Sequence, residues 1–147
     1  MVSMKRDEAL RELSRDHHQA LFRAMRMKRA TDADVDEVRQ DVLEFWGGHG
    51  ARHFRVEEEV LLPAFAAGGD PEDDAVVRVL VDHVWIRERI GRLAANELEL
   101  DELHTLGERL EAHIRHEERI LFPMIERALD EGALSSLGER IAAAEFG

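Results

Sequence analysis

The sequence predicts an all-α protein, an antiparallel up-down-up-down four-helix bundle with a short C-terminal fifth helix. Three observations favour this fold. Apolar residues recur at helical spacing along almost the whole chain. The links between the helical segments are short, which makes neighbouring helices antiparallel, and hairpin turns of the Asn-Gly or Asp-Gly type are missing. No linker-like stretch divides the sequence, so we expect a single domain over residues 1–147.

The first two helices follow from their apolar stripes and their end signals. The second helix is predicted from about Asp32 to Ala67, with Thr31 or Asp32 as its N-cap. Each glycine in a helix costs about 1 kcal/mol relative to alanine, so a kink or local break is expected at residues 47–50. The inward stripe of the first helix recurs at steps of three and four residues and comprises Leu10, Leu13, His17, Ala20, Ala24 and Met27.

The remaining helices are predicted in the same way. The third begins at Asp70-Pro71, with the aspartate as cap and the proline at the first helical position. A short fifth helix is expected over 134–144. The inward residues of the third helix are Val76, Leu80, His83, Ile86, Ile90 and Leu93. Those of the fourth helix are Leu103, Leu106, Leu110, His113, Glu117, Leu121 and Met124.

Composition excludes several classes of function. The chain has 32 acidic and 20 basic residues and a net charge of −12, so nucleic acid and anionic membrane surfaces are poor partners. Cysteine is absent, which excludes thiol catalysis, iron–sulfur clusters and thiolate zinc sites. No apolar run reaches the length of about 18 residues that a membrane span needs, and no signal peptide is recognisable, so we expect a cytoplasmic protein.

A repeat of thirteen residues carries the chemistry. Residues 53–65 read HFRVEEEVLLPAF and residues 113–125 read HIRHEERILFPMI, 60 positions further along. Both copies share the pattern H-x-R-x-E-E-x-x-L-x-P. A weaker pairing links the first and third helices, where Asp16-His17 and Asp82-His83 each stand among apolar residues.

The spacing of the repeat places a histidine and a glutamate together on the inward face. Residues four apart lie one turn apart, so His53 projects with Glu57 and His113 with Glu117. A buried, ionised carboxylate costs several kcal/mol unless it is paired or bound to a metal. Lysine cannot supply the partners, because Lys5 and Lys28 are the only ones in the chain, and inward arginine is scarce. Imidazole and carboxylate without sulfur suit iron, manganese or zinc, and two carboxylates that can bridge predict a dinuclear site.

These motifs resemble the hemerythrin-like family, the hemerythrin HHE cation-binding domain, over about residues 10–129. The resemblance implies a non-haem di-iron site inside the bundle, with two irons per chain bridged by carboxylates and by an oxo or hydroxo group. The ligands that it implies by position are His17 or His18, His53, Glu57, His83, His113 and Glu117, with both glutamates bridging. On the first helix His17 lies on the apolar stripe and is the favoured ligand, with His18 at the rim.

The sequence also departs from the oxygen-carrying hemerythrins. Those have a second histidine four positions after the first on the third helix, where this chain has Arg87. Glu117 stands in place of an aspartate one position further along. Water in the vacated coordination position would open redox or peroxide chemistry.

Smaller expectations concern the neighbours of these residues. Glu58 and Glu118 either accept hydrogen bonds from the ligand imidazoles, pair with Arg55 or Arg115, or serve as plain surface charge. His104 is expected at the solvated surface. Pro63 and Pro123 each remove one helix hydrogen bond and are expected to bend their helices.

Two functions from different classes remain open at this point. One is a binding protein that senses, scavenges or stores oxygen, nitric oxide or iron. The alternative is a di-iron enzyme of the peroxidase or catalase type, acting on peroxide. A metal-free interaction module is disfavoured by the buried carboxylates. The sequence identifies no catalytic residue that would decide between the first two.

Overall fold

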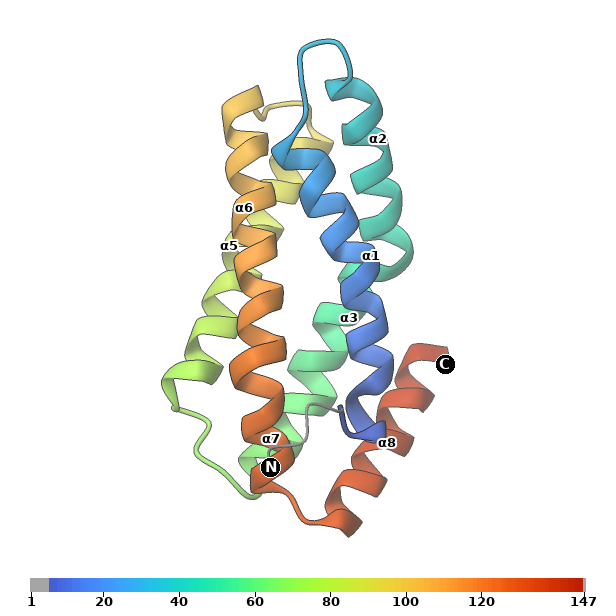
Figure 1. The fold of residues 1–147 in the computed structure, drawn as a ribbon, viewed down its shortest axis with the longest axis vertical. Coiled ribbons are helices and arrows are strands. Elements are labelled where there is room, and N and C mark those ends of the chain that lie inside the picture. The colour runs from blue at the N-terminus through green and yellow to red at the C-terminus, as the bar shows by residue number, and fades with distance from the viewer. Residues whose placement is uncertain (1–5, 147) are drawn as a thin grey trace.

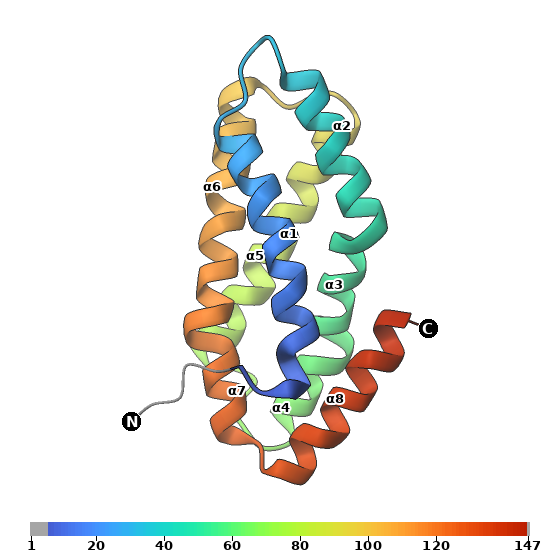
Figure 2. The same cartoon turned by 45° about the vertical axis from the view of Figure 1, so that its right-hand side comes forward.

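The computed structural model describes residues 6–146, and every regular element within that range is helical. The predicted all-α class is therefore confirmed. Figures 1 and 2 show the long helical segments lying side by side along the long axis, with the C-terminal helix packed against their outer side. None of the helices described is both long and apolar enough to cross a membrane.

The N-terminal helix follows the predicted stripe. A short 3₁₀ turn, η1 (Glu8–Leu10), leads into α1 (Arg11–Lys28). The Asp7 carboxylate accepts a hydrogen bond from the Ala9 amide at 2.9 Å and so caps the entry. The buried residues of α1 are Leu13, His17, Ala20, Ala24 and Met27.

The second helical segment runs without interruption through five pieces. These are α2 (Val35–Phe45), η2 (Trp46–Gly50), α3 (Ala51–Val56), η3 (Glu57–Leu61) and α4 (Leu62–Ala66). The helix does not break at the glycines, where a kink or local break was expected. The chain instead widens into a π-turn, in which the Ala51 amide bonds to the Trp46 carbonyl. The predicted start is three residues early, because Asp34 precedes the helix and accepts the Thr31 amide at 2.7 Å.

The third long helix, α5 (Asp74–Ala94), begins later than predicted. Asp70 and Pro71 belong to a turn, and Asp73 is the N-cap, with its carboxylate accepting the Ala75 amide at 2.9 Å. The inward stripe is also corrected at one position. Leu80 is 41% exposed, whereas Val79 is fully buried, because a step of three from Val76 and then of four to His83 keeps all three on one face.

The last long segment consists of α6 (Leu100–His116), η4 (Glu117–Leu121) and α7 (Phe122–Ala128). A reciprocal capping box between Glu99 and Glu102 starts α6. The final helix, α8 (Glu131–Phe146), is longer than the predicted fifth helix and buries Leu137 and Ile141 against the rest of the molecule.

The two prolines of the repeat are accommodated by π-turns. Pro63 and Pro123 lie at the start of α4 and α7, directly after η3 and η4. In each π-turn the residue before the proline bonds to the carbonyl of a glutamate five positions back, Glu57 or Glu117. The helical path therefore continues past each proline, with a wide turn that begins at the glutamate of the motif.

The core consists of two apolar clusters. One contains Leu13, Val79, Leu121 and Phe122 among its members, and the other contains Met27, Phe54, Ile86 and Leu106. Along each long segment the inward histidine lies between residues of the two clusters. A layer of ionisable side chains thus separates the two apolar parts of the core.

Candidate metal centre

The layer between the two apolar clusters contains four histidines and two glutamates. Each long segment supplies one histidine, and the second and fourth also supply a glutamate one helical turn further along. Glu57 and Glu117 are completely buried. The histidines of the layer, all between 1% and 6% exposed, are His17, His53, His83 and His113.

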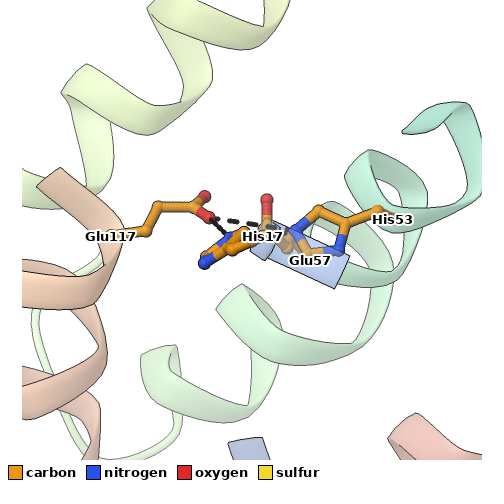
Figure 3. A group of neighbouring side chains, drawn as sticks. All are labelled: His17, His53, Glu57 and Glu117. Atoms are coloured by element: carbon orange, nitrogen blue, oxygen red, sulfur yellow. Dashed lines mark hydrogen bonds and ion pairs between the residues drawn. The ribbon is translucent and has the colours of Figure 1, made fainter. Parts of the chain in front are cut away.

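The four imidazoles direct their Nε2 atoms toward the two glutamates. His53 Nε2 lies 3.1 Å from Glu57 Oε2, and His83 Nε2 lies 3.0 Å from Glu57 Oε1. The other carboxylate has the same surroundings, with His17 Nε2 at 2.8 Å from Glu117 Oε1 and His113 Nε2 at 3.2 Å from Glu117 Oε2. Figure 3 shows Glu117 reaching across to His17 and His53.

Four of these atoms are buried and lie close to one another, but none has a partner in hydrogen-bonding geometry. They are Glu57 Oε1, Glu117 Oε2, His83 Nε2 and His113 Nε2. Leaving such a group unsatisfied costs about 1–3 kcal/mol, more when it is charged. Imidazole nitrogens and carboxylate oxygens that converge in a dry interior are the donor set of a bound cation. The residues present therefore fit a metal ion.

The donor atoms form two groups, within each of which all atoms lie within 4.8 Å of one another. One group is His17, His53, Glu57 and Glu117, and the other is Glu57, His83, His113 and Glu117. Both glutamates belong to both groups. The arrangement can hold two cations, each with two histidines of its own and two shared carboxylates.

Each imidazole also binds a carboxylate through its outer nitrogen. The Nδ1 atoms of His17 and His83 lie 2.6 Å from Glu118 and Glu58, respectively. Of the roles considered for these two glutamates, the structure shows the hydrogen bonds to the imidazoles. Donation from Nδ1–H leaves the lone pair of Nε2 directed at the centre and orients the ring.

The two aspartates of the repeated Asp-His pairs serve histidines on other helices. Asp16 accepts from His53 Nδ1 at 3.0 Å, and Asp82 accepts from His113 Nδ1 at 3.0 Å. Sequence reasoning noticed both pairs but missed these partners. The signal was the recurrence of an aspartate directly before a histidine. Because adjacent residues on a helix point about 100° apart, each aspartate faces a different neighbour from the histidine beside it.

Arg87 stands four positions after His83, where a second histidine was found to be missing from the sequence. It binds the carboxylate that contacts the His83 imidazole. Its guanidinium donates to Glu58 Oε2 at 2.6 Å, and the same oxygen accepts from His83 Nδ1. Burial by itself would raise the pKa of Glu58, but these hydrogen bonds and charges lower it. Arg87 therefore keeps the carboxylate that orients His83 ionised.

The charges of the centre hold protons on His17, His53 and His113 when no cation is bound. Burial opposes protonation of His113, but the Glu117 charge and the hydrogen bond to Asp82 raise its pKa to about 10. Burial would raise the pKa of Glu117, but the His113 charge and the close approach of His17 and His53 lower it well below its ordinary value. Protons and cations thus compete for the same atoms.

The other histidines lie outside the two groups of donor atoms. His18 is exposed, so of the two neighbouring candidates only His17 reaches the centre. His104 is not solvated as expected, because its Nε2 lies 2.8 Å from the Ala30 carbonyl. His116 is buried and bonds to the Ala75 carbonyl at 2.9 Å.

An apolar cavity of about 40 Å³ adjoins the centre. The ionisable residues that line it include Asp16, His17, His53, His113 and Glu117, and the apolar ones include Met27, Val42, Phe45, Phe54, Ile86 and Leu106. Exposed His49 lies at the same cavity. A cavity must offer about 10–15 Å³ to hold one water molecule, so this cavity suits a molecule of very few atoms.

The fold and this centre define a class, that of helical proteins with a buried histidine and carboxylate cation site. Residues 9–133 match the family model of the hemerythrin HHE cation binding domain, and the chain belongs to that family. The resemblance noted in the sequence is therefore confirmed. Among curated proteins and solved structures, no match to the chain was found.

Proposed function

We propose that the chain is a non-haem di-iron protein built as an antiparallel up-down-up-down four-helix bundle. His17 and His53 would hold one iron, and His83 and His113 the other. Glu57 and Glu117 would bridge the two. The observation that carries this proposal is that both glutamates belong to both groups of converging donor atoms.

The donor chemistry supports iron over the alternatives. Nitrogen and carboxylate donors without sulfur, with coordination positions left open, are typical of non-haem iron that reacts with oxygen species. Each ion would receive four protein donors, so open positions remain for a small ligand. When bound, the iron pair would supply redox chemistry and a Lewis-acidic binding position.

The residues of the chain position this chemistry and keep water from it. The ring of Phe54 stacks on His83 at 3.7 Å and 8°, and Phe122 stacks on His17 at 5.4 Å and 13°. The outer carboxylates fix the imidazole tautomers. The apolar walls of the cavity favour a small, weakly hydrated molecule over bulk water.

The partner we propose is a small diatomic ligand or peroxide that reaches the centre through this cavity. The protein would sense, scavenge or store oxygen, nitric oxide or iron, in the cytoplasm and without a nucleic acid or membrane partner. A peroxidase or catalase-like activity is the second candidate. It is favoured by Arg87, which takes the place of a histidine ligand and leaves one coordination position open.

The test of the metal centre is iron loading under anaerobic conditions, followed by metal analysis and an optical spectrum. We expect two irons per chain in the natural protein. The double variant His113→Ala with Glu117→Ala should lose iron, and His17→Ala should lose it whereas the neighbouring exposed control His18→Ala should not. Unchanged iron content and thermal stability in the double variant would refute the proposal.

A second assay separates the two candidate functions. Peroxide disproportionation by the iron-loaded protein is compared with that of the same amount of free iron. A rate above free iron favours the enzyme, and no excess favours the binding protein. The His113→Ala and Glu117→Ala double variant serves as the control for iron bound elsewhere.

A further inference from the structure

Arg87 reaches the surroundings of the His83 imidazole by two routes. Its guanidinium donates to Glu58 Oε2, the same oxygen that accepts from His83 Nδ1. The guanidinium carbon also lies 5.6 Å from the centre of the Phe54 ring, and that ring stacks on the imidazole. One arginine therefore contacts both groups that orient His83, the carboxylate at its Nδ1 atom and the aromatic ring on its face.

The same arrangement recurs around His17, with Arg6 in the place of Arg87. Glu118 Oε2 accepts from His17 Nδ1, and Arg6 Nη2 donates to the other oxygen of that carboxylate, Oε1, at 3.4 Å. The guanidinium carbon lies 5.4 Å from the centre of the Phe122 ring, which stacks on the His17 imidazole. Each of the two groups of donor atoms thus has one histidine whose flanking carboxylate and ring contact an arginine.

Arg6 is held in this position by α7 and by the backbone. Its Nη1 atom donates to Glu126 Oε1 at 2.7 Å, and its Nη2 atom donates to the Glu118 carbonyl oxygen at 2.7 Å. The backbone amide of Asp7 donates to the second oxygen of Glu126 at 2.6 Å. The Arg6 side chain is only 18% exposed, so salt screens these contacts less than those of a surface pair. The two residues before η1 are therefore fastened to α7.

The two arginines come from unrelated parts of the chain. Arg87 lies in α5, inside the residues 9–133 that the family model matches, whereas Arg6 precedes them. Glu58 and Glu118, in contrast, occupy equivalent positions of the repeat, 60 residues apart. Figures 1 and 2 show the first described residues at the same end of the molecule as α7. The tertiary structure thus supplies each copy of the repeat with an arginine from outside the repeat.

We propose that Arg6 is a positioning residue for the iron that His17 and His53 would hold. It fixes the carboxylate and the aromatic ring that flank His17, and through them it orients the imidazole. Arg87 has the same role at the other iron. The inference rests on the proposed di-iron function and adds to it that one of the two iron positions depends on the docking of the N-terminal segment on α7.

The expected consequence is a selective loss of affinity for one of the two irons. Substituting an outer partner of a metal-bound histidine costs about 10–100-fold in metal affinity. Arg6 acts one step further out, and Ser14 Oγ, which donates to Glu118 at 2.7 Å, stays in place when the arginine is removed. We therefore expect a loss near the lower end, about 10-fold, at one iron only.

The experiment uses the full chain loaded with iron and titrated with a chelator, with the retained iron and its Mössbauer spectrum as readouts. Arg6→Met keeps a long side chain but removes the donor groups. It should release one iron at about 10-fold lower chelator concentration and change one of two iron signals. Arg15→Met is the matched control and should behave as the natural protein, because Arg15 is 65% exposed and pairs with Glu12 on the same helix.

A double variant shows whether the two arginines serve different irons. Arg87→Met should also weaken one iron, and Arg6→Met combined with Arg87→Met should weaken both. A purely structural role of Arg6 would lower the resistance of both irons together in the single variant. The inference is overturned if Arg6→Met matches the natural protein, if it weakens both irons equally, or if the double variant still holds one iron as firmly as the natural protein. Failure of the natural protein to bind two irons would overturn the proposed function itself.

Discussion

Replacing Gly107 with alanine should destabilise the protein, although alanine is the better helix former. Gly107 lies inside α6 and is buried against α1. A Cβ atom at this position would lie 2.7 Å from the Ala24 carbonyl oxygen and 2.9 Å from Met27 Cβ. Both atoms belong to the backbone or the base of a side chain on α1, so neither can move without shifting that helix.

The magnitude follows from two opposing contributions. Alanine in a helix interior is favoured over glycine by about 1 kcal/mol. Overpacking a close contact costs about 1–3 kcal/mol, and a clash with backbone belongs at the upper end. The net loss for Gly107→Ala is therefore about 1–2 kcal/mol, or a fall of roughly 2–8 °C in the unfolding midpoint.

Gly91 supplies the matched control. It lies inside α5, is exposed, and has nothing within 4 Å of the position of a Cβ atom. Gly91→Ala should raise stability by about 0.5–1 kcal/mol, because only the helix preference changes. Urea unfolding followed by circular dichroism, with a chelator present, measures both variants without a contribution from metal. A Gly107→Ala protein at least as stable as the natural one would refute the reasoning.

Two further predictions concern the centre itself. The pKa of His113 is raised to about 10, so its proton stabilises the metal-free protein fully below pH 6.5, and this contribution is lost as the pH rises through about 10. Urea unfolding in chelator between pH 6 and 10 should show the decline, and a flat profile would contradict it. Asp82→Asn should weaken iron binding about 10–100-fold in a chelator titration, because the outer partner of His113 loses its charge. The exposed control Asp74→Asn should leave the affinity unchanged.

The helices and the histidine–glutamate pairs of the centre could be predicted from the sequence, because both depend on local spacing along the chain. Residues four apart share a helix face whatever the surroundings, so His53 with Glu57 and His113 with Glu117 follow directly from the repeat. The chain has only two lysines, so lysine cannot neutralise the buried carboxylates, and this favoured a bound cation as their partner. The stripe of the first helix also favoured His17 over His18, and the structure buries the former and exposes the latter.

The helix starts and some inward positions were less predictable, because neighbouring residues offer the same local signal. Asp70 and Asp73 are both suitable caps, and the choice between them moves the start of α5 by several residues. Val79 and Leu80 are equally apolar. Packing against the other helices decides which of the two turns inward.

The sequence by itself thus determined the helical class, the repeated histidine and glutamate pairs and their suitability for a cation. Only the tertiary structure decided which carboxylate serves which imidazole. Asp16 binds His53, Asp82 binds His113, Glu58 binds His83 and Glu118 binds His17. The reason is physical: contacts within one helix repeat with a fixed period, whereas contacts between helices depend on how the helices are rotated and packed against one another.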